Sequence, residues 1–128
     1  MIGKREWTKT LWHAKRIFDE NSEIESFEEP VEYSKRKGNG INYQPMSGYT
    51  DTLSFGENVR NYQKALVPSS LFYKVFQEGD KVYIDGVEYQ SNEAYYGEKA
   101  NYVVDSVRNQ NLMILVIFKK ITKGAIYG

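Results

Sequence analysis

The chain has 128 residues, 17 basic and 17 acidic side chains, and no cysteine. A chain of this length is expected to form one domain spanning residues 1–128, and without cysteine it has no disulfide and no thiolate metal site. Proteins that wrap a nucleic-acid backbone are usually clearly basic, so the zero net charge disfavours that class. The longest apolar run, residues 112–118, is far too short to span a bilayer, and we expect no membrane partner.

The first third of the chain alternates between strand-like segments and charged loops. Residues 10–18 favour a strand, although the spacing of their apolar side chains also fits a helix. Residues 27–34 are predicted to form a strand that Pro30 restricts to a sheet edge or a bulge. After a turn-rich loop at 35–40, residues 41–46 could pair back with that strand as a hairpin.

The middle of the chain contains two further predicted strands and one helical turn. Residues 49–55 alternate imperfectly between apolar and polar side chains, and residues 60–67 form a second candidate strand that Pro68 ends. The two serines that follow, Ser69 and Ser70, precede an apolar run to residue 76 and predict a capped helical turn.

Asp85 and Gly86 carry the strongest local signal in the sequence. They lie between two β-rich runs, residues 81–84 and 87–90. A type I′ turn needs positive φ at both central residues, which the Asp-Gly pair tolerates, so this pattern predicts a β-hairpin around a structural turn.

The C-terminal third is the most hydrophobic part of the chain. Residues 100–107 alternate as a strand does, and residues 108–111 are predicted to be a polar connection. Residues 112–121 are rich in branched side chains on both faces, which predicts a central, fully buried strand. Short strands at this regular spacing predict an all-β fold, a small antiparallel barrel or sandwich with one or two short helical turns.

Residue types that perform catalysis or bind metals are scarce. His13 is the one histidine, and a lone histidine is more often packed or on the surface than a ligand. No second histidine or cysteine can complete a zinc site. The adjacent Glu28 and Glu29 lie in a charged segment where nothing indicates the desolvation that acid catalysis requires. We therefore expect a protein without catalytic residues, metal or cofactor.

Charge is segregated along the sequence. Residues 19–32 contain seven acids and no base, and Lys35, Arg36 and Lys37 follow directly. Such runs are usually solvated loops, and the functional alternative is an electrostatic docking surface. Tyrosines near Lys99 and near the basic run leave a nucleic-acid-binding barrel as another alternative, because tyrosine stacks on bases.

Three stretches, residues 76–86, 100–107 and 111–120, resemble the head-completion and "minor capsid" proteins of tailed-bacteriophage necks. In that family a strand ending in an Asp-Gly turn precedes a strand of the type Tyr-x-Val-x-Ser-Val. A final apolar strand then ends in lysines. The resemblance covers residues 76–121, and the N-terminal half matches more loosely.

This resemblance implies a small β-barrel that forms a ring of six or twelve copies in the virion neck, after assembly in the host cytoplasm. Its partners would be portal or adaptor proteins on one side and a tail-terminator protein on the other. Some members act as a stopper, in which a loop enters the channel and retains the packaged DNA end. A tail-terminator or tail-completion protein is the nearest alternative within this class.

The resemblance also assigns candidate residues in this sequence. The candidate channel or plug loop lies within residues 35–48 and comprises Lys35, Arg36, Lys37, Gly38, Asn39, Gly40, Tyr43 and Gly48. The candidate contacts between subunits are Glu28, Glu29, Glu32, Lys119 and Lys120. The N-terminal arm 1–9 and the C-terminal tail 122–128 are expected to become ordered only on assembly.

Overall fold

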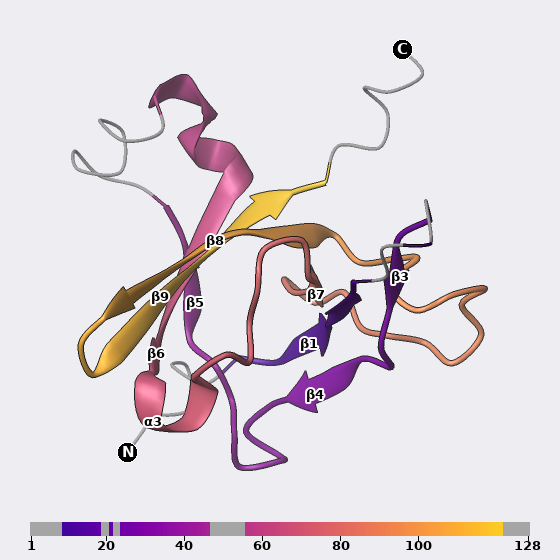
Figure 1. Cartoon of the computed structure of the whole chain (residues 1–128), viewed down its shortest axis with the longest axis horizontal. Coiled ribbons are helices and arrows are strands. Elements are labelled where there is room, and N and C mark those ends of the chain that lie inside the picture. The colour runs from indigo at the N-terminus through magenta and orange to yellow at the C-terminus, as the bar shows by residue number, and fades with distance from the viewer. Residues whose placement is uncertain (1–8, 19–20, 22–23, 47–55, 122–128) are drawn as a thin grey trace.

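A curled antiparallel sheet of seven strands organises the chain in a computed structural model that describes residues 9–18, 21, 24–46 and 56–121 (Figure 1). The strand order is β4-β1-β7-β8-β9-β6-β5, and every neighbouring pair is antiparallel. The sheet curls into a half barrel, which confirms the predicted all-β, barrel-like fold. Its strands are β1 (Leu11–Ala14), β4 (Val31–Tyr33), β5 (Tyr43–Pro45), β6 (Tyr62–Pro68), β7 (Lys81–Tyr83), β8 (Tyr102–Gln110) and β9 (Met113–Lys120).

Smaller elements complete the described part of the chain. Strands β2 (Arg16–Ile17) and β3 (Ser26–Phe27) form a separate two-stranded sheet. A 3-10 helix, η1 (Gly56–Asn61), leads into β6, so the predicted strand at 60–67 begins two residues later than expected. One α-helical turn, α3 (Ser69–Phe72), follows β6.

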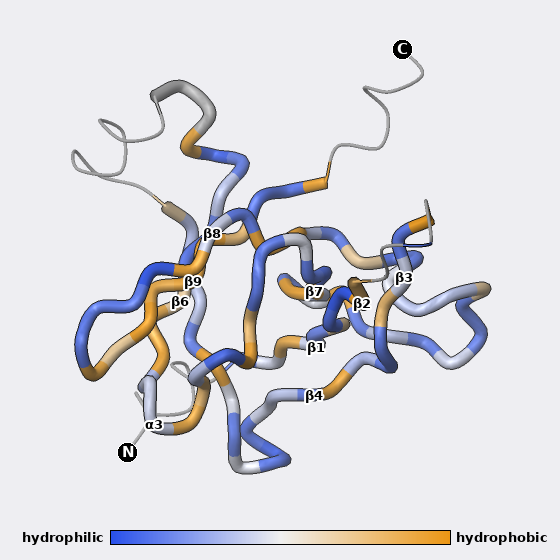
Figure 2. Tube along the Cα trace, in the orientation of Figure 1, coloured by the Kyte–Doolittle hydropathy of each residue, from blue (hydrophilic) through white to orange (hydrophobic). Residues whose placement is uncertain are grey.

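Strand β9 is the interior strand that the sequence predicted. It pairs along its length with β8 on one side and β6 on the other, and Figure 2 shows it among the most hydrophobic segments. Val116, Ile117 and Phe118 are consecutive and all buried, so both faces of the strand are covered there, while Lys119 and Lys120 are exposed.

The connection between β8 and β9 is shorter than predicted. Residues 108–110 continue β8, and the reversal is a two-residue turn at Asn111 and Leu112. Asn111 has a φ of 58°, a left-handed conformation that asparagine tolerates better than most side chains. The polar composition of 108–110 indicated a loop, but polar side chains are equally compatible with an exposed strand end.

The concave side of the curled sheet encloses the core. Lys9 bridges to Ile41 and its Nζ donates to the Tyr43 carbonyl at 2.8 Å, which draws the start of β5 toward the start of β1. Helix α3 and the following turn add Phe72 and Phe76. The core residues are Leu11, Ile41, Tyr43, Ala65, Val67, Phe72, Phe76, Val82, Ile84, Tyr102, Val104, Ile114, Val116 and Phe118.

The two predicted N-terminal strands exist but are each interrupted. Residues 10–18 divide into β1 and β2 at Lys15, and residues 27–34 divide into β3 and β4 around Pro30. The Lys15 carbonyl accepts a hydrogen bond from the Glu28 N–H at 2.8 Å, so the interruptions face each other. Strand β4 lies at a sheet edge, as Pro30 predicted.

The predicted hairpin between residues 27–34 and 41–46 is wrong. Strand β5 pairs with β6 at the opposite edge of the sheet, with Tyr43 opposite Ala65. The loop signal at 35–40 was correct, because the chain does reverse there. A local turn signal reports a reversal and cannot specify which strand the returning chain joins.

The predicted Asp85-Gly86 turn is correct, but the hairpin around it is wrong. The φ angles are 56° and 86°, and the Val87 N–H donates to the Ile84 carbonyl at 3.2 Å. Residues 87–90 form no strand. Both edges of β7 are already hydrogen-bonded, to β1 and to β8, so no edge remains for a returning strand.

The two serines predicted to cap the helical turn lie inside it and do not cap it. Pro68 occupies the N-cap position and no side chain caps α3. Instead, Ser69 Oγ donates to the carbonyls of Asn111 at 3.3 Å and Leu112 at 2.9 Å. This ties α3 to the β8–β9 turn. The predicted strand at 49–55, the tail 122–128 and the arm apart from Lys9 lie outside the described residues.

Candidate functional site

The convex face of β1 and β7 is covered by a long loop, residues 85–100. Trp12 and Tyr83 lie opposite each other in the strand register and point away from the core. The Tyr89 ring lies 5.7 Å from the Trp12 ring and 6.1 Å from the Tyr83 ring, and the Tyr96 ring lies 6.2 Å from that of Tyr89. Tilted and edge-to-face aromatic contacts therefore hold the loop against the strands.

A buried tyrosine and a glutamate hold this loop in shape. Tyr83 Oη donates to Glu93 Oε1 at 2.7 Å and accepts from the Gly97 N–H at 3.0 Å. Glu93 also accepts from the N–H groups of Gln90 at 2.9 Å and Lys99 at 3.1 Å. These hydrogen bonds fix the conformation of the loop.

These contacts shift two pKa values. Burial, and then the neighbouring Glu93 carboxylate, raise the pKa of Tyr83 above its ordinary value. Burial by itself raises the pKa of Glu93. Its hydrogen bonds from the Gln90 N–H, Tyr83 Oη and the Lys99 N–H outweigh that effect and hold the pKa below its ordinary value.

Gly97 lets the loop pass close to β3 and β7. Its φ is 88°, and a Cβ placed there would lie 3.2 Å from Lys81 Cδ and 3.5 Å from the Phe27 ring. Glycine is the residue that meets both requirements without strain.

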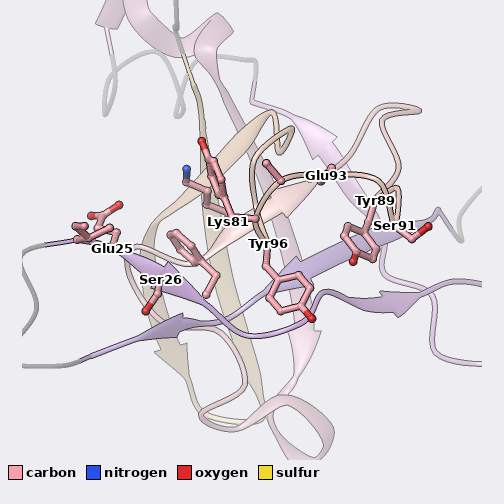
Figure 3. Close-up of a pocket in the computed structure, with 11 residues that line it drawn as sticks. Glu25, Ser26, Lys81, Tyr89, Ser91, Glu93 and Tyr96 are labelled. Atoms are coloured by element: carbon pink, nitrogen blue, oxygen red, sulfur yellow. The ribbon is translucent and has the colours of Figure 1, made fainter.

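A groove of about 980 Å³ opens between this loop and β3 (Figure 3). We call it the tyrosine groove. Its lining residues are Ile24, Glu25, Ser26, Phe27, Lys81, Tyr89, Ser91, Glu93, Ala94, Tyr95 and Tyr96. An aromatic surface bearing a few polar groups is typical of binding sites.

The two segments that build the groove are acidic. Residues 17–34 contain seven acids and no base, and residues 82–98 contain four acids and no base. Lys81 supplies the one basic side chain among the lining residues, and its Nζ lies 5.1 Å from the Phe27 ring centre. Glu25 is paired with Arg16 at 3.4 Å. The groove therefore favours apolar or basic ligands over phosphates.

Exposed large apolar side chains among the described residues gather in two regions. One region surrounds the groove, and the other lies on α3 and the β8–β9 turn. In Figure 1, α3 and this turn lie at the left of the molecule, and β3 with the loop 85–100 lies at the right. The groove region has Ile17, Phe18, Ile24, Tyr95 and Tyr96; the other has Leu71, Tyr73 and Leu112; Val31 and Leu66 are exposed elsewhere.

We call the second region, defined by Leu71, Tyr73, Arg108 and Leu112, the hairpin-tip patch. Leu71 is 72% exposed and Leu112 is 81% exposed, while the Ser69 hydrogen bonds hold the two segments together. Residues 69–77 and 106–118 contain no acid. This patch is apolar and basic, whereas the segments around the groove are acidic.

The predicted plug loop forms a tight turn after β4. The Gly38 N–H donates to the Lys35 carbonyl at 3.0 Å, and Asn39 Oδ1 accepts from the Ser34 N–H at 3.0 Å. Gly38 has a φ of 76°, and Gly40 is half-buried after the turn. The exposed residues of this turn are Lys35, Arg36, Lys37, Gly38 and Asn39.

Tyr43 does not belong to that exposed turn. It is buried in β5, and its hydroxyl accepts from the Asp85 N–H at 2.8 Å. Gln63 Nε2 donates to the Asp85 carboxylate, so Asp85 joins β7 to both β5 and β6. The remaining candidate, Gly48, lies outside the described residues.

The acids and lysines predicted to meet across a contact between subunits lie on different parts of one chain. Glu32 accepts from Ser34 Oγ and pairs with Arg36 of its own chain, each at 2.7 Å. The hydrogen bond from Ser34, with Arg36 beside it, holds the pKa of Glu32 below its ordinary value. The other candidates are exposed on two different elements: Glu28 and Glu29 between β3 and β4, and Lys119 and Lys120 at the end of β9.

His13 belongs to a buried polar brace. Its Nε2 lies 2.6 Å from Asp80 Oδ2, and Asp80 also accepts from the N–H groups of Arg16 and Gln77, each at 2.9 Å. His13 is 4% exposed and Asp80 is fully buried, whereas a catalytic imidazole has to reach a substrate. Sequence reasoning missed Asp80, and the only available signal was that a buried histidine needs a partner.

Metal clusters, membrane-spanning helices and known relatives would each indicate another kind of function. Among the described residues, no three or more His, Cys, Asp or Glu side chains cluster closely enough to hold a metal ion. No helix in the described ranges has the length and apolar character needed to cross a membrane. No protein-family model, curated protein or solved structure matches the chain.

Proposed function

We propose that this chain is a structural connector, a head-completion protein of a tailed-phage neck that forms a ring between the portal or adaptor and the tail. The resemblance over residues 76–121 supports this proposal, and the small curled sheet is compatible with it. The observation that carries the proposal is the presence of two exposed apolar surfaces on opposite sides of the molecule, the tyrosine groove and the hairpin-tip patch.

Two different surfaces suit a ring better than a symmetric dimer. A dimer with two-fold symmetry needs one self-complementary surface, whereas a ring needs two different surfaces that fit each other head to tail. The ring closes when the rotation between neighbouring copies divides a full turn. The net charge of zero also limits the repulsion between many adjacent copies.

The charge around the groove favours a protein partner over a nucleic acid. Binding to a nucleic-acid backbone depends on basic side chains that neutralise phosphates. Tyr89, Tyr95 and Tyr96 could stack on bases, but they lie in a segment with four acids and no base. The tyrosines of this groove are therefore better suited to apolar and cationic side chains.

The test is assembly with the proposed partners. The full chain is purified alone and together with any portal, adaptor and tail-terminator proteins that genes adjacent to its own are found to encode, and masses are measured by native mass spectrometry. We expect a monomer alone and a ring of six or twelve copies on the portal or adaptor. A chain that binds none of these proteins, or that shifts labelled DNA at moderate salt, would overturn the proposal.

A further inference from the structure

We propose that the hairpin-tip patch of one copy docks in the tyrosine groove of the next copy. This inference rests on the proposed ring and identifies the contact that would build it. The occupant of the groove is therefore a second copy of this chain, which presents Leu112, Leu71 and Arg108.

The tip protrudes at the end of a hairpin, and the groove is large enough to receive it. The β8–β9 turn lies at the end of the two longest strands, and Leu112 at that turn is 81% exposed. The groove volume of about 980 Å³ lies at the upper end of the range of roughly 300–1,000 Å³ that is common for binding pockets. It has room for the turn and neighbouring side chains of α3, not just for one leucine.

The side chains at the contact are also complementary. Leu71 and Leu112 need an apolar surface, and the groove provides Ile24, Phe27 and the tyrosine rings. Tyr95 is 61% exposed, so much of its surface is free to be buried by a partner. Aromatic side chains in a desolvated pocket commonly supply most of the binding energy at protein interfaces.

Charge selects the head-to-tail arrangement. Residues 69–77 and 106–118 carry Lys74 and Arg108 without any acid, whereas the groove segments 17–34 and 82–98 carry acids without any base. Docking tip to groove brings Arg108 toward Glu25 and Glu93, the acids that line the groove, and toward its tyrosine rings; both attract a guanidinium. Groove against groove, or tip against tip, would instead bring like charges together.

One chain cannot make this contact with itself, because its tip and groove lie on opposite sides of the molecule (Figure 1). The lack of native cysteine makes the contact easy to test by disulfide formation. Tyr95→Cys and Leu112→Cys place one thiol on each surface, at exposed positions where neither substitution disturbs the core.

The two single-cysteine proteins are mixed under mild oxidation, and covalent dimers are followed over time. We expect the mixed dimer to form at least about tenfold faster than either symmetric dimer, since even brief docking between monomers brings these two thiols together and oxidation then traps the pair. The matched control replaces Leu112→Cys with Gln44→Cys, an exposed position on the edge strand β5 that belongs to neither surface. Equal rates for these two positions would overturn the inference.

The doubly substituted protein, carrying Tyr95→Cys and Leu112→Cys, is then assembled with the portal or adaptor. A covalent ladder that ends at six or twelve copies supports both the ring and the contact. A ring without cross-links overturns the contact and leaves the proposed function standing. Fast mixed cross-linking without binding to any neck protein supports the contact and overturns the proposed function. Failure of both experiments overturns both proposals.

Discussion

The concave and convex faces of β1 and β7 bury side chains by different chemistry. On the concave face, Leu11 and Val82 join an apolar core centred on β9. On the convex face, Trp12 and Tyr83 are covered by a loop that hydrogen bonds and aromatic contacts hold in place. The same two strands thus support a solvent-excluded core on one face and a partly solvent-exposed loop on the other.

This difference separates stability from recognition. Apolar burial is cooperative and depends on the whole sheet, so damage to the concave face is expected to affect the entire fold. The convex cover depends on a few directional contacts around Glu93. Substitutions of the exposed tyrosines in this cover should therefore leave the core intact. Such tolerance suits a binding surface.

The largest effect is expected from truncating the core. Phe118→Ala removes a fully buried ring from β9 and should lower the free energy of unfolding by about 3–5 kcal/mol. Tyr96→Ala on the convex side should cost far less, because that side chain is partly exposed. Urea denaturation followed by tryptophan fluorescence measures both, and similar losses would contradict the distinction between the faces.

The next largest effect is expected at the buried brace. Asp80→Ala leaves His13 and the N–H groups of Arg16 and Gln77 without their acceptor. Removing one member of a buried pair typically costs about 3 kcal/mol or more. Asp105→Ala, at an exposed position in β8, should change stability by less than about 0.5 kcal/mol in the same denaturation experiment.

A smaller and more local effect is expected from Tyr83→Phe. This change removes the hydroxyl that donates to Glu93 and accepts from the Gly97 N–H, at a cost of about 1–3 kcal/mol. Hydrogen exchange should accelerate at Gly97 and Lys99 before it does so in β9. Tyr95→Phe, at an exposed position, serves as the control; uniform acceleration along the chain would show that the cover is not a separate unit.

The smallest effect is expected from the titration of Glu93. Because its pKa is lower in the folded protein than the reference value of 4.5, its ionised form stabilises the fold. That contribution is complete above pH 4.5 and is lost as the pH falls through the folded pKa. The stability difference between the native chain and Glu93→Gln should therefore shrink between neutral pH and about pH 3; a difference independent of pH would contradict this.

The candidate site was only partly accessible to sequence reasoning. The sequence indicated Tyr95 and Tyr96 as a possible base-stacking surface near Lys99. It did not indicate that this acidic segment lies beside residues 24–27. The groove exists because the loop at 85–100 packs against β3, more than fifty residues away in the chain. No local pattern contains that contact.

By itself, the sequence determined the features that arise from neighbouring residues. Alternating apolar side chains predicted β8, a strand-like run ended by Pro68 predicted β6, branched side chains predicted the buried strand β9, and Asp85 with Gly86 predicted a turn. Side-chain periodicity and backbone sterics are local properties, so they can be read without knowledge of the fold.

Only the tertiary structure decided which strands became neighbours and what covers them. Strand β5 joined β6 rather than β4, β7 used both of its edges, and Asp80 met His13 across 67 residues. These outcomes depend on how the sheet curls to bury its concave face, because each strand pairs where its apolar side chains reach the common core. That choice is a property of the whole chain and of no single segment.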